Sequence, residues 1–183
     1  MSAQENEPAN LDPGPSPRRG EIYSRLAAHI AHAGVGERAA LSRLQAESMQ
    51  PHQLAALARA LLSAGLTPDH WHADTWSRWA LIAQGIALAG HDGRERLGSQ
   101  LAAAGVSESR VTKLMTSRGD AFVQLLPRIV RLLSSKGVSP NWTELGGLVL
   151  AESRLDPGKS LEAEEIRLGI AGRYFSALAR SAN

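Results

Sequence analysis

The sequence predicts an all-α protein, arranged as two small packed helical bundles made of eight or nine short helices. From residue 18 onward the apolar residues recur at helical spacing, and no run alternates apolar and polar residues as a half-buried strand does. Of the 183 residues 43% are hydrophobic, which is enough for one compact domain or two small ones. Glycine and proline interrupt the apolar pattern often, so the individual helices are short.

The chain is expected to have three parts. Residues 1–17 form a flexible leader, because they contain four prolines and little that can be buried. An N-terminal helical lobe covers residues 18–90 and a C-terminal helical lobe covers residues 91–183, with the seam near 90–94. Abundant alanine allows the helices to approach closely within and between the lobes.

The helices of the N-terminal lobe each show an apolar face that ends at glycine or proline. They are predicted at about residues 21–33, 37–48, 51–64 and 80–88. Gly65 is the expected C-terminal cap of the third helix. Three tryptophans precede the fourth helix, which reads as the central buried one. For Trp76 and Trp79 the apolar run that follows favours core packing over base stacking, whereas Trp71, in a turn, fits either role.

The helices of the C-terminal lobe are shorter at first and longest at the end. They are predicted at about residues 97–104, 107–115 and 119–133, then from 139–141 onward, and finally at 161–179. Pro127 is expected to kink or restart the third of these helices, since proline removes a backbone donor. A polar loop at 156–158 is expected to precede the last helix.

Positive charge is concentrated in one part of the chain. The formal net charge is only +2, and 17 of the 20 cationic residues are arginine, yet residues 94–136 hold eight cations against three anions. Such a segment favours a polyanionic partner. Arg110 and Lys113, like Arg128 and Arg131, lie three residues apart, so successive helices can present cations on one side. A GC-rich genome and solvated helix faces would also explain the arginines.

Several classes of protein receive no support. No cysteine is present, which removes disulfides and thiolate sites and fits a reducing cytoplasm. Neither a signal peptide nor an apolar stretch of about 20 residues is visible, so we expect a soluble cytoplasmic protein with no membrane contact. No P-loop, GxSxG elbow or SxxK pair is present, and we expect neither catalysis nor a cofactor. The histidines near residues 29–32 and 70–72 lack a third ligand at helical spacing, so no metal site is predicted.

The cationic region carries a recognisable motif. Residues 97–114 read LGSQLAAAGVSESRVTKL, and Arg118 and Leu-Pro-Arg128 follow, an order that resembles the LGxxLAxxGxxExRxxxL…R…LxR signature of the CasB family. Residues 36–44 are similar to that family's G-x-RAxLxRL segment, and residues 141–145 to its DWxxL step. The last helix resembles a C-terminal VRxxWARDYY element, but Ile170 stands where tryptophan is common and Gly172-Arg173 where Arg-Asp is common.

The CasB family provides the small subunit of Cascade, the type I-E CRISPR surveillance complex. The resemblance implies a two-lobed, non-catalytic all-α protein, present as two copies beside the large subunit and the repeated backbone subunits. Its implied role is to stabilise the R-loop formed by CRISPR RNA and target DNA, by holding the displaced non-target strand and steadying the target strand. Matching the family's arginines assigns phosphate contacts to Arg38, Arg43, Arg110, Arg118 and Arg128. Spacing alone adds Lys113 and Arg131.

Two other functions stay open from the sequence. A helical protein-interaction adaptor without nucleic-acid binding would use its arginines only for solubility. A small hydrolase would need an active site that no motif reveals. Loss of DNA binding on charge reversal of Arg110 and Arg128 would distinguish the R-loop-stabilising subunit from the adaptor.

Overall fold

Helices joined by short connections make up the part of the chain that the structure covers. The computed structural model describes residues 18–152 and 157–182, and within these ranges it contains nine α-helices, one 3-10 helix and no strand. The α-helices are α1 (Arg19–His32), α2 (Val35–Ser42), α3 (Pro51–Ser63), α4 (Ala73–Ala89), α5 (Leu97–Ala103), α6 (Glu108–Thr116), α7 (Gly119–Ser135), α8 (Trp142–Ala151) and α9 (Pro157–Ser181). The predicted all-α fold is therefore confirmed. The predicted leader, residues 1–17, lies outside the described residues.

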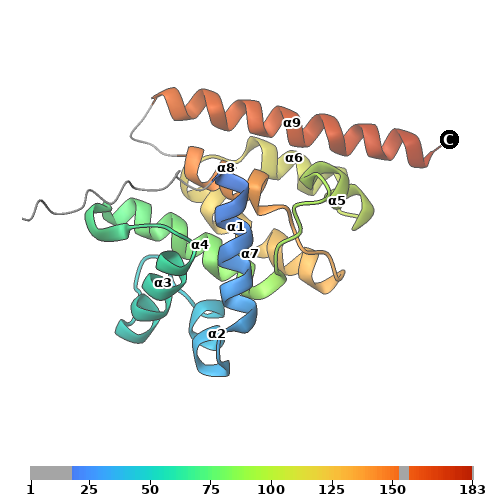
Figure 1. Cartoon of the computed structure of the whole chain (residues 1–183). Helices are drawn as coiled ribbons and strands as arrows, with labels where there is room; N and C mark the ends of the chain where they lie inside the picture. The colour runs from blue at the N-terminus through green and yellow to red at the C-terminus, as the bar shows by residue number, and fades with distance from the viewer. Residues whose placement is uncertain (1–17, 153–156, 183) are drawn as a thin grey trace, which may run out of the picture.

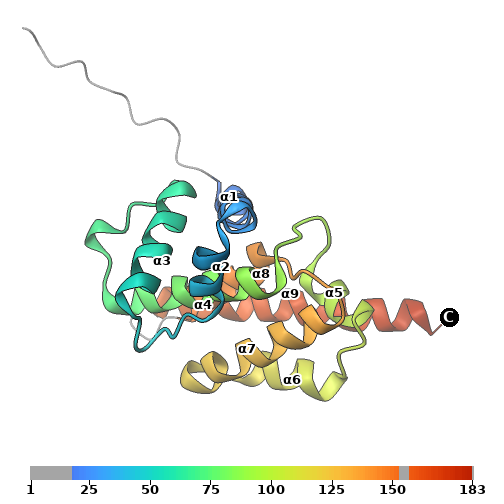
Figure 2. The same ribbon diagram turned by 90° about the horizontal axis from the view of Figure 1, so that it is seen from below.

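Helix α4 is the centre of the fold, as the sequence predicted. It packs against α1, α2, α3, α7 and α8. Helix α9 lies across one side of the molecule, where it contacts α5, α6 and α8, and its C-terminal end extends past the other helices (Figures 1 and 2). Among the described residues no helix has both the length and the apolar composition that a bilayer span requires.

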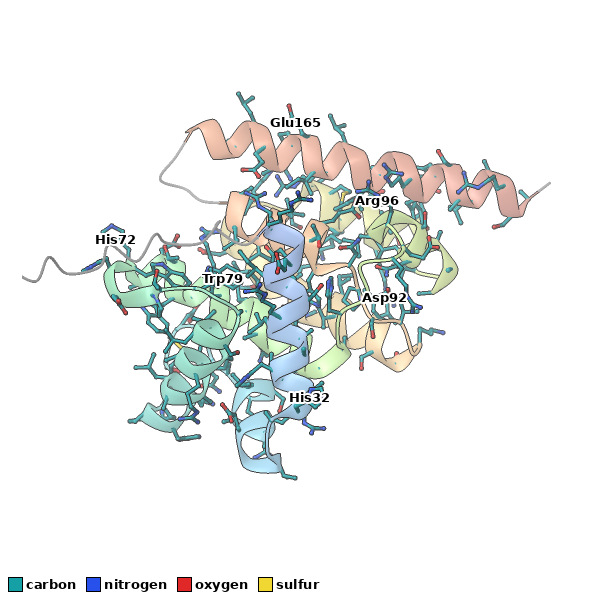
Figure 3. The ribbon with its side chains drawn as sticks, viewed as in Figure 1. His32, His72, Trp79, Asp92, Arg96 and Glu165 are labelled. Carbon is teal, nitrogen blue, oxygen red and sulfur yellow. The ribbon has the colours of Figure 1, made fainter. Side chains whose placement is uncertain are left out.

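The tryptophans pack inside the protein. Helix α4 begins at Ala73, earlier than predicted, so it includes Trp76 and Trp79. The ring of Trp79, labelled in Figure 3, is buried. It stacks with Tyr23 and with Trp71, with ring centroids 5.9 Å apart in both pairs. Stacked aromatic pairs of this kind add to the stability of a core. Core packing of Trp79 is confirmed, and Trp76 is partly buried against the same core.

Besides the start of α4, three further predictions about helix boundaries were wrong. Helix α2 ends at Ser42 instead of near residue 48, because the chain turns there and brings Leu44 into the core. Helix α7 does not restart at Pro127, since buried residues on both sides of the proline hold one continuous helix in place. The alternative expectation, a kink at Pro127, stays a prediction. Helix α9 begins at Pro157, where a loop was expected, and proline suits the first turn of a helix.

The division into two lobes stays a prediction. Buried residues before and after Gly90 belong to one hydrophobic cluster, in which Tyr23 and Trp79 lie together with Trp142 and Leu148. The side chain of Trp142 passes over Gly85 of α4, where a Cβ atom would collide with the indole ring. The two predicted lobes therefore share an extensive apolar contact.

Gly98 allows α5 to lie directly on α9. A Cβ atom at this position would be 2.7 Å from the Tyr174 amide nitrogen and 2.8 Å from the Arg173 Cβ, and it would also collide with the Ile170 carbonyl oxygen. Backbone atoms cannot rotate away as a side chain can. We therefore expect Gly98→Ala to lower the free energy of unfolding by about 3 kcal/mol, as measured by urea denaturation.

Gly169→Ala is the matched control for this substitution. Gly169 lies on α9, the helix against which Gly98 packs, and a Cβ atom there would meet nothing within 4 Å. Alanine is a better helix former than glycine, so we expect this variant to be more stable than wild type by about 0.5–1 kcal/mol. Equal stability of the two variants would contradict the close approach of α5 and α9.

Tyr23 has a buried hydroxyl group without a partner. The residue is fully buried, and its hydroxyl oxygen makes no hydrogen bond in the described structure. Because an unsatisfied buried polar group costs free energy, we expect Tyr23→Phe to leave the stability at pH 7 unchanged or higher by up to about 1 kcal/mol. The contrasting variant is Tyr174→Phe, since the Tyr174 hydroxyl donates to the Val106 carbonyl at 2.6 Å, and its loss should destabilise by about 1 kcal/mol.

Burial also raises the pKa of the Tyr23 phenol above its ordinary value of 10.0. The folded chain therefore keeps this proton at a pH where the unfolded chain releases it. Stability should be lost as pH rises above about 10, and Tyr23→Phe should remove this part of the loss. Urea denaturation at pH 7 and pH 10.5 measures both effects. If wild type and Tyr23→Phe lost the same amount of stability between pH 7 and pH 10.5, the predicted contribution of the Tyr23 phenol would be contradicted.

Candidate nucleic-acid interface

All seven cations predicted to bind phosphate have exposed side chains. They come from three regions: Arg38 and Arg43 from α2 and its C-terminal cap, Arg110 and Lys113 from α6, and Arg118, Arg128 and Arg131 from the start and middle of α7. Exposure is the first requirement for contact with a polyanion. The sequence prediction meets it at every position.

Helix α7 separates its apolar and cationic residues onto opposite sides. Its buried residues are Phe122, Leu126, Ile129, Val130 and Leu133, which recur at three- and four-residue intervals. At 3.6 residues per turn, Arg128 and Arg131 lie opposite this face, together with the exposed Gln124 and Ser135. Burial of the apolar face against α4 thus fixes the direction of both arginines toward solvent.

Helix α6 also combines buried apolar residues with exposed cations. Val111 and Leu114 are buried, whereas Arg110 and Lys113 are exposed. Helices α6 and α7 pack against each other and lie side by side (Figure 2). We call Arg110, Lys113, Arg128 and Arg131 together the α6–α7 cationic face.

In-chain ion pairs distinguish this face from the other arginines of the region. Arg94 pairs with Asp92 at 2.8 Å and Arg96 with Glu144 at 3.1 Å. The four members of the α6–α7 cationic face, in contrast, have no hydrogen bond or ion pair from their side chains within the described residues. Their charges are available to an external anion without the loss of an internal contact.

Two of the predicted arginines have partners inside the chain. The Arg118 guanidinium donates to the Glu164 carboxylate of α9 at 2.9 Å and to the Met115 carbonyl at 2.6 Å. The Arg38 guanidinium donates to the carbonyls of Ala31 and Ala33, both at 3.2 Å, where α1 ends. These two residues therefore support helix ends as well as being exposed. The Arg43 side chain, like the α6–α7 cationic face, has no partner among the described residues.

Sequence reasoning missed Arg167, which is 3% exposed. Its guanidinium pairs with Glu152 and with Glu164, and it also donates to the Ser117 carbonyl at 3.2 Å. Glu152 in turn accepts from the Gly119 amide at 2.8 Å, at the first turn of α7. This network ties α8 and α9 to the start of α7 and so positions the α6–α7 cationic face. One signal in the sequence could have revealed it. Arg167 recurs at helical spacing with Ala163, Ile170 and Tyr174, which places it on the same side of α9 as these residues.

A cleft lies beside this network. It is lined by Arg118 and Arg167 and also by Asp120 and Glu152. Among the described lining residues, positive and negative side chains are thus mixed. Within the described residues there is also no group of three or more histidines or carboxylates that could hold a metal ion.

The comparisons with known proteins agree with the motif in the cationic region. The family model described as CRISPR-associated protein Cse2 matches residues 37–175. No match was found among curated proteins or among solved structures. The matched segment extends from α2 to α9 and includes every cation predicted to bind phosphate. The chain therefore belongs to the CRISPR-associated Cse2 family, the CasB family of small subunits of the type I-E Cascade complex.

Proposed function

We propose that this Cascade subunit is non-catalytic and binds the DNA backbone without sequence specificity, in cytoplasmic antiviral defence. It stabilises the R-loop by holding the displaced non-target strand and steadying the target strand. The observation that carries the proposal is the α6–α7 cationic face, whose four cations lie on two neighbouring helices and have no in-chain partner within the described residues.

A cationic surface of this kind can stabilise the R-loop because the exchange of DNA strands is nearly balanced in free energy. The RNA–DNA duplex that forms is about as stable as the DNA duplex that it replaces, so backbone contacts decide whether the open state persists. Arginine suits this task because its planar, always charged guanidinium donates two parallel hydrogen bonds to phosphate oxygens. Contacts to phosphate position a strand and do not read its sequence.

Further contacts are proposed around this face. Arg43 is exposed and has no partner among the described residues, so it can bind phosphate directly. Arg38 and Arg118 are proposed to use donors left over from their in-chain contacts. The proposed protein partners are the large subunit, the repeated backbone subunits and a second copy of this chain.

The salt dependence of DNA binding tests the proposal on the purified chain. A fluorescent single-stranded DNA of arbitrary sequence is titrated at several salt concentrations. Four phosphate contacts predict a slope of log affinity against log salt of about −3, and similar slopes for unrelated sequences. No binding at low salt, or a slope near zero, would contradict direct strand contact and would favour the helical adaptor without nucleic-acid binding.

A further inference from the structure

Glu164 of α9 binds two arginines at once. Its carboxylate accepts from Arg118, at the start of α7, and from Arg167, one turn further along α9. The Arg118 Nη2 lies 2.7 Å from Oε1 and 2.9 Å from Oε2 of the carboxylate, and the Arg167 Nη1 lies 2.9 Å from the same Oε1. Guanidinium groups bind phosphate through the same kind of charged hydrogen bond, so Glu164 occupies Arg118 as a phosphate oxygen would.

The contacts of Arg118 inside the chain restrict what its guanidinium can offer to a phosphate. Nη1 donates to the carbonyls of Met115 at 2.6 Å and Ser117 at 3.0 Å. A guanidinium has two pairs of parallel donors, Nε with Nη2 and Nη1 with Nη2, and both pairs include Nη2. A phosphate that binds through either pair must therefore share Nη2 with the Glu164 carboxylate. Two anions at one nitrogen repel each other, so the carboxylate opposes the contact.

The pair between Arg118 and Glu164 is the exposed part of the network around Arg167. Both of its side chains are 45% exposed. Arg167 is itself neutralised by the buried Glu152 and also donates to the Ser117 carbonyl, so it keeps partners when Glu164 changes. Water and salt screen an exposed pair, which therefore contributes little to stability. An external phosphate can thus compete with Glu164 for Arg118 without breaking the buried pair.

We propose that Glu164 is an internal competitor of DNA phosphate for Arg118, and that it lowers the affinity of this chain for nucleic acid. The inference rests on the proposed function, because Arg118 is one of the arginines assigned there to phosphate. When a strand binds, the Arg118 Nη2 exchanges the carboxylate for a phosphate oxygen, and Glu164 stays paired with Arg167. Because Glu164 belongs to α9 and Arg118 to the start of α7, a shift of α9 away from α7 would free Arg118 in the same way.

Removal of the Glu164 charge tests this competition. The affinity of the full chain for a labelled single-stranded DNA is measured at low salt by fluorescence anisotropy. Glu164→Gln should raise the affinity about three- to fivefold, because glutamine keeps an acceptor for Arg167 but no longer holds Arg118 by charge. A pair with a merely structural role predicts the opposite direction or no change, since the loss of a structural contact does not improve binding.

Glu162→Gln is the matched control for the change in net charge. Glu162 lies on the same helix, two residues before Glu164, and its side chain is 38% exposed. It pairs with Arg19 of α1, to which no phosphate contact is assigned, so this variant also frees an exposed arginine. We expect its affinity to rise less than about twofold, through the general field alone. Circular dichroism of both variants checks that the helices are intact.

A double-mutant cycle shows whether the effect passes through Arg118. When Arg118→Gln is already present, adding Glu164→Gln should raise the affinity no more than the control does. An equal rise with and without Arg118, or an equal rise from Glu164→Gln and Glu162→Gln, would overturn this inference and leave the proposed DNA binding intact. If neither wild type nor Glu164→Gln bound DNA at low salt, the inference and the proposed function would both be overturned.

Discussion

Reversing two charges on the α6–α7 cationic face should weaken the binding of single-stranded DNA by about a hundredfold or more. The variant is Arg110→Glu with Arg128→Glu, one substitution on each helix. Each change removes an attraction to phosphate and adds a repulsion. Both side chains are exposed and have no partner within the described residues, so the fold should be unaffected. Fluorescence anisotropy with labelled DNA measures the affinity.

The control for this experiment keeps the same net charge. Arg25→Glu with Arg59→Glu also lowers the charge by four, but Arg25 lies on α1 and Arg59 on α3. Their ion pairs with Glu21 and Glu37 are exposed and contribute little to stability. We expect this variant to lose less than about fivefold in affinity, through the general field alone. Equal losses in the two variants would show that net charge, and not the face, determines binding.

Replacing Arg167 with methionine should lower the free energy of unfolding by about 3–5 kcal/mol. The substitution leaves Glu152 as an uncompensated buried charge, since its side chain is 8% exposed and Arg167 is its ion-pair partner. The Glu164 contact and the hydrogen bond to Ser117 are lost as well. Urea denaturation followed by circular dichroism measures the effect.

Two further variants show whether burial of the charge is the cause. Adding Glu152→Gln to Arg167→Met removes the unpaired charge and keeps an acceptor for the Gly119 amide, so it should restore part of the stability. Arg96→Met breaks the pair with Glu144, but the Arg96 side chain is 58% exposed, and the loss should stay below about 1 kcal/mol. A small effect of Arg167→Met, or no recovery in the double variant, would contradict this role of the network.

The helices were predictable where apolar spacing and a stop residue agree. Pro51 at the start of α3 and Asn141 before α8 act locally, and the Asn141 side chain does accept from the Thr143 amide at 2.9 Å. Predictions were wrong where distant packing outweighs the local signal. A restart at Pro127 was wrong because buried residues on both sides of the proline belong to one continuous helix α7, which packs against α4.

The exposure of the candidate cations followed from helix periodicity, but their partners did not. Glu164 lies 46 positions after Arg118 in the chain, and only the packing of α9 brings the two side chains together. Arg167 was missed for a related reason. Arginine is seldom buried, and a helix of mixed composition such as α9 gives little indication of which side faces the core.

Photo-cross-linking in the assembled complex tests the central claim most directly. A benzophenone amino acid replaces Gln124, which is exposed on the same side of α7 as Arg128 and Arg131, and in a second preparation Ser176 of α9. Cascade containing each variant is bound to target DNA and irradiated. We predict that the probe at position 124 cross-links to several neighbouring nucleotides of the displaced strand, and that the probe at 176 does not. An open R-loop without any DNA cross-link from position 124 would contradict the account.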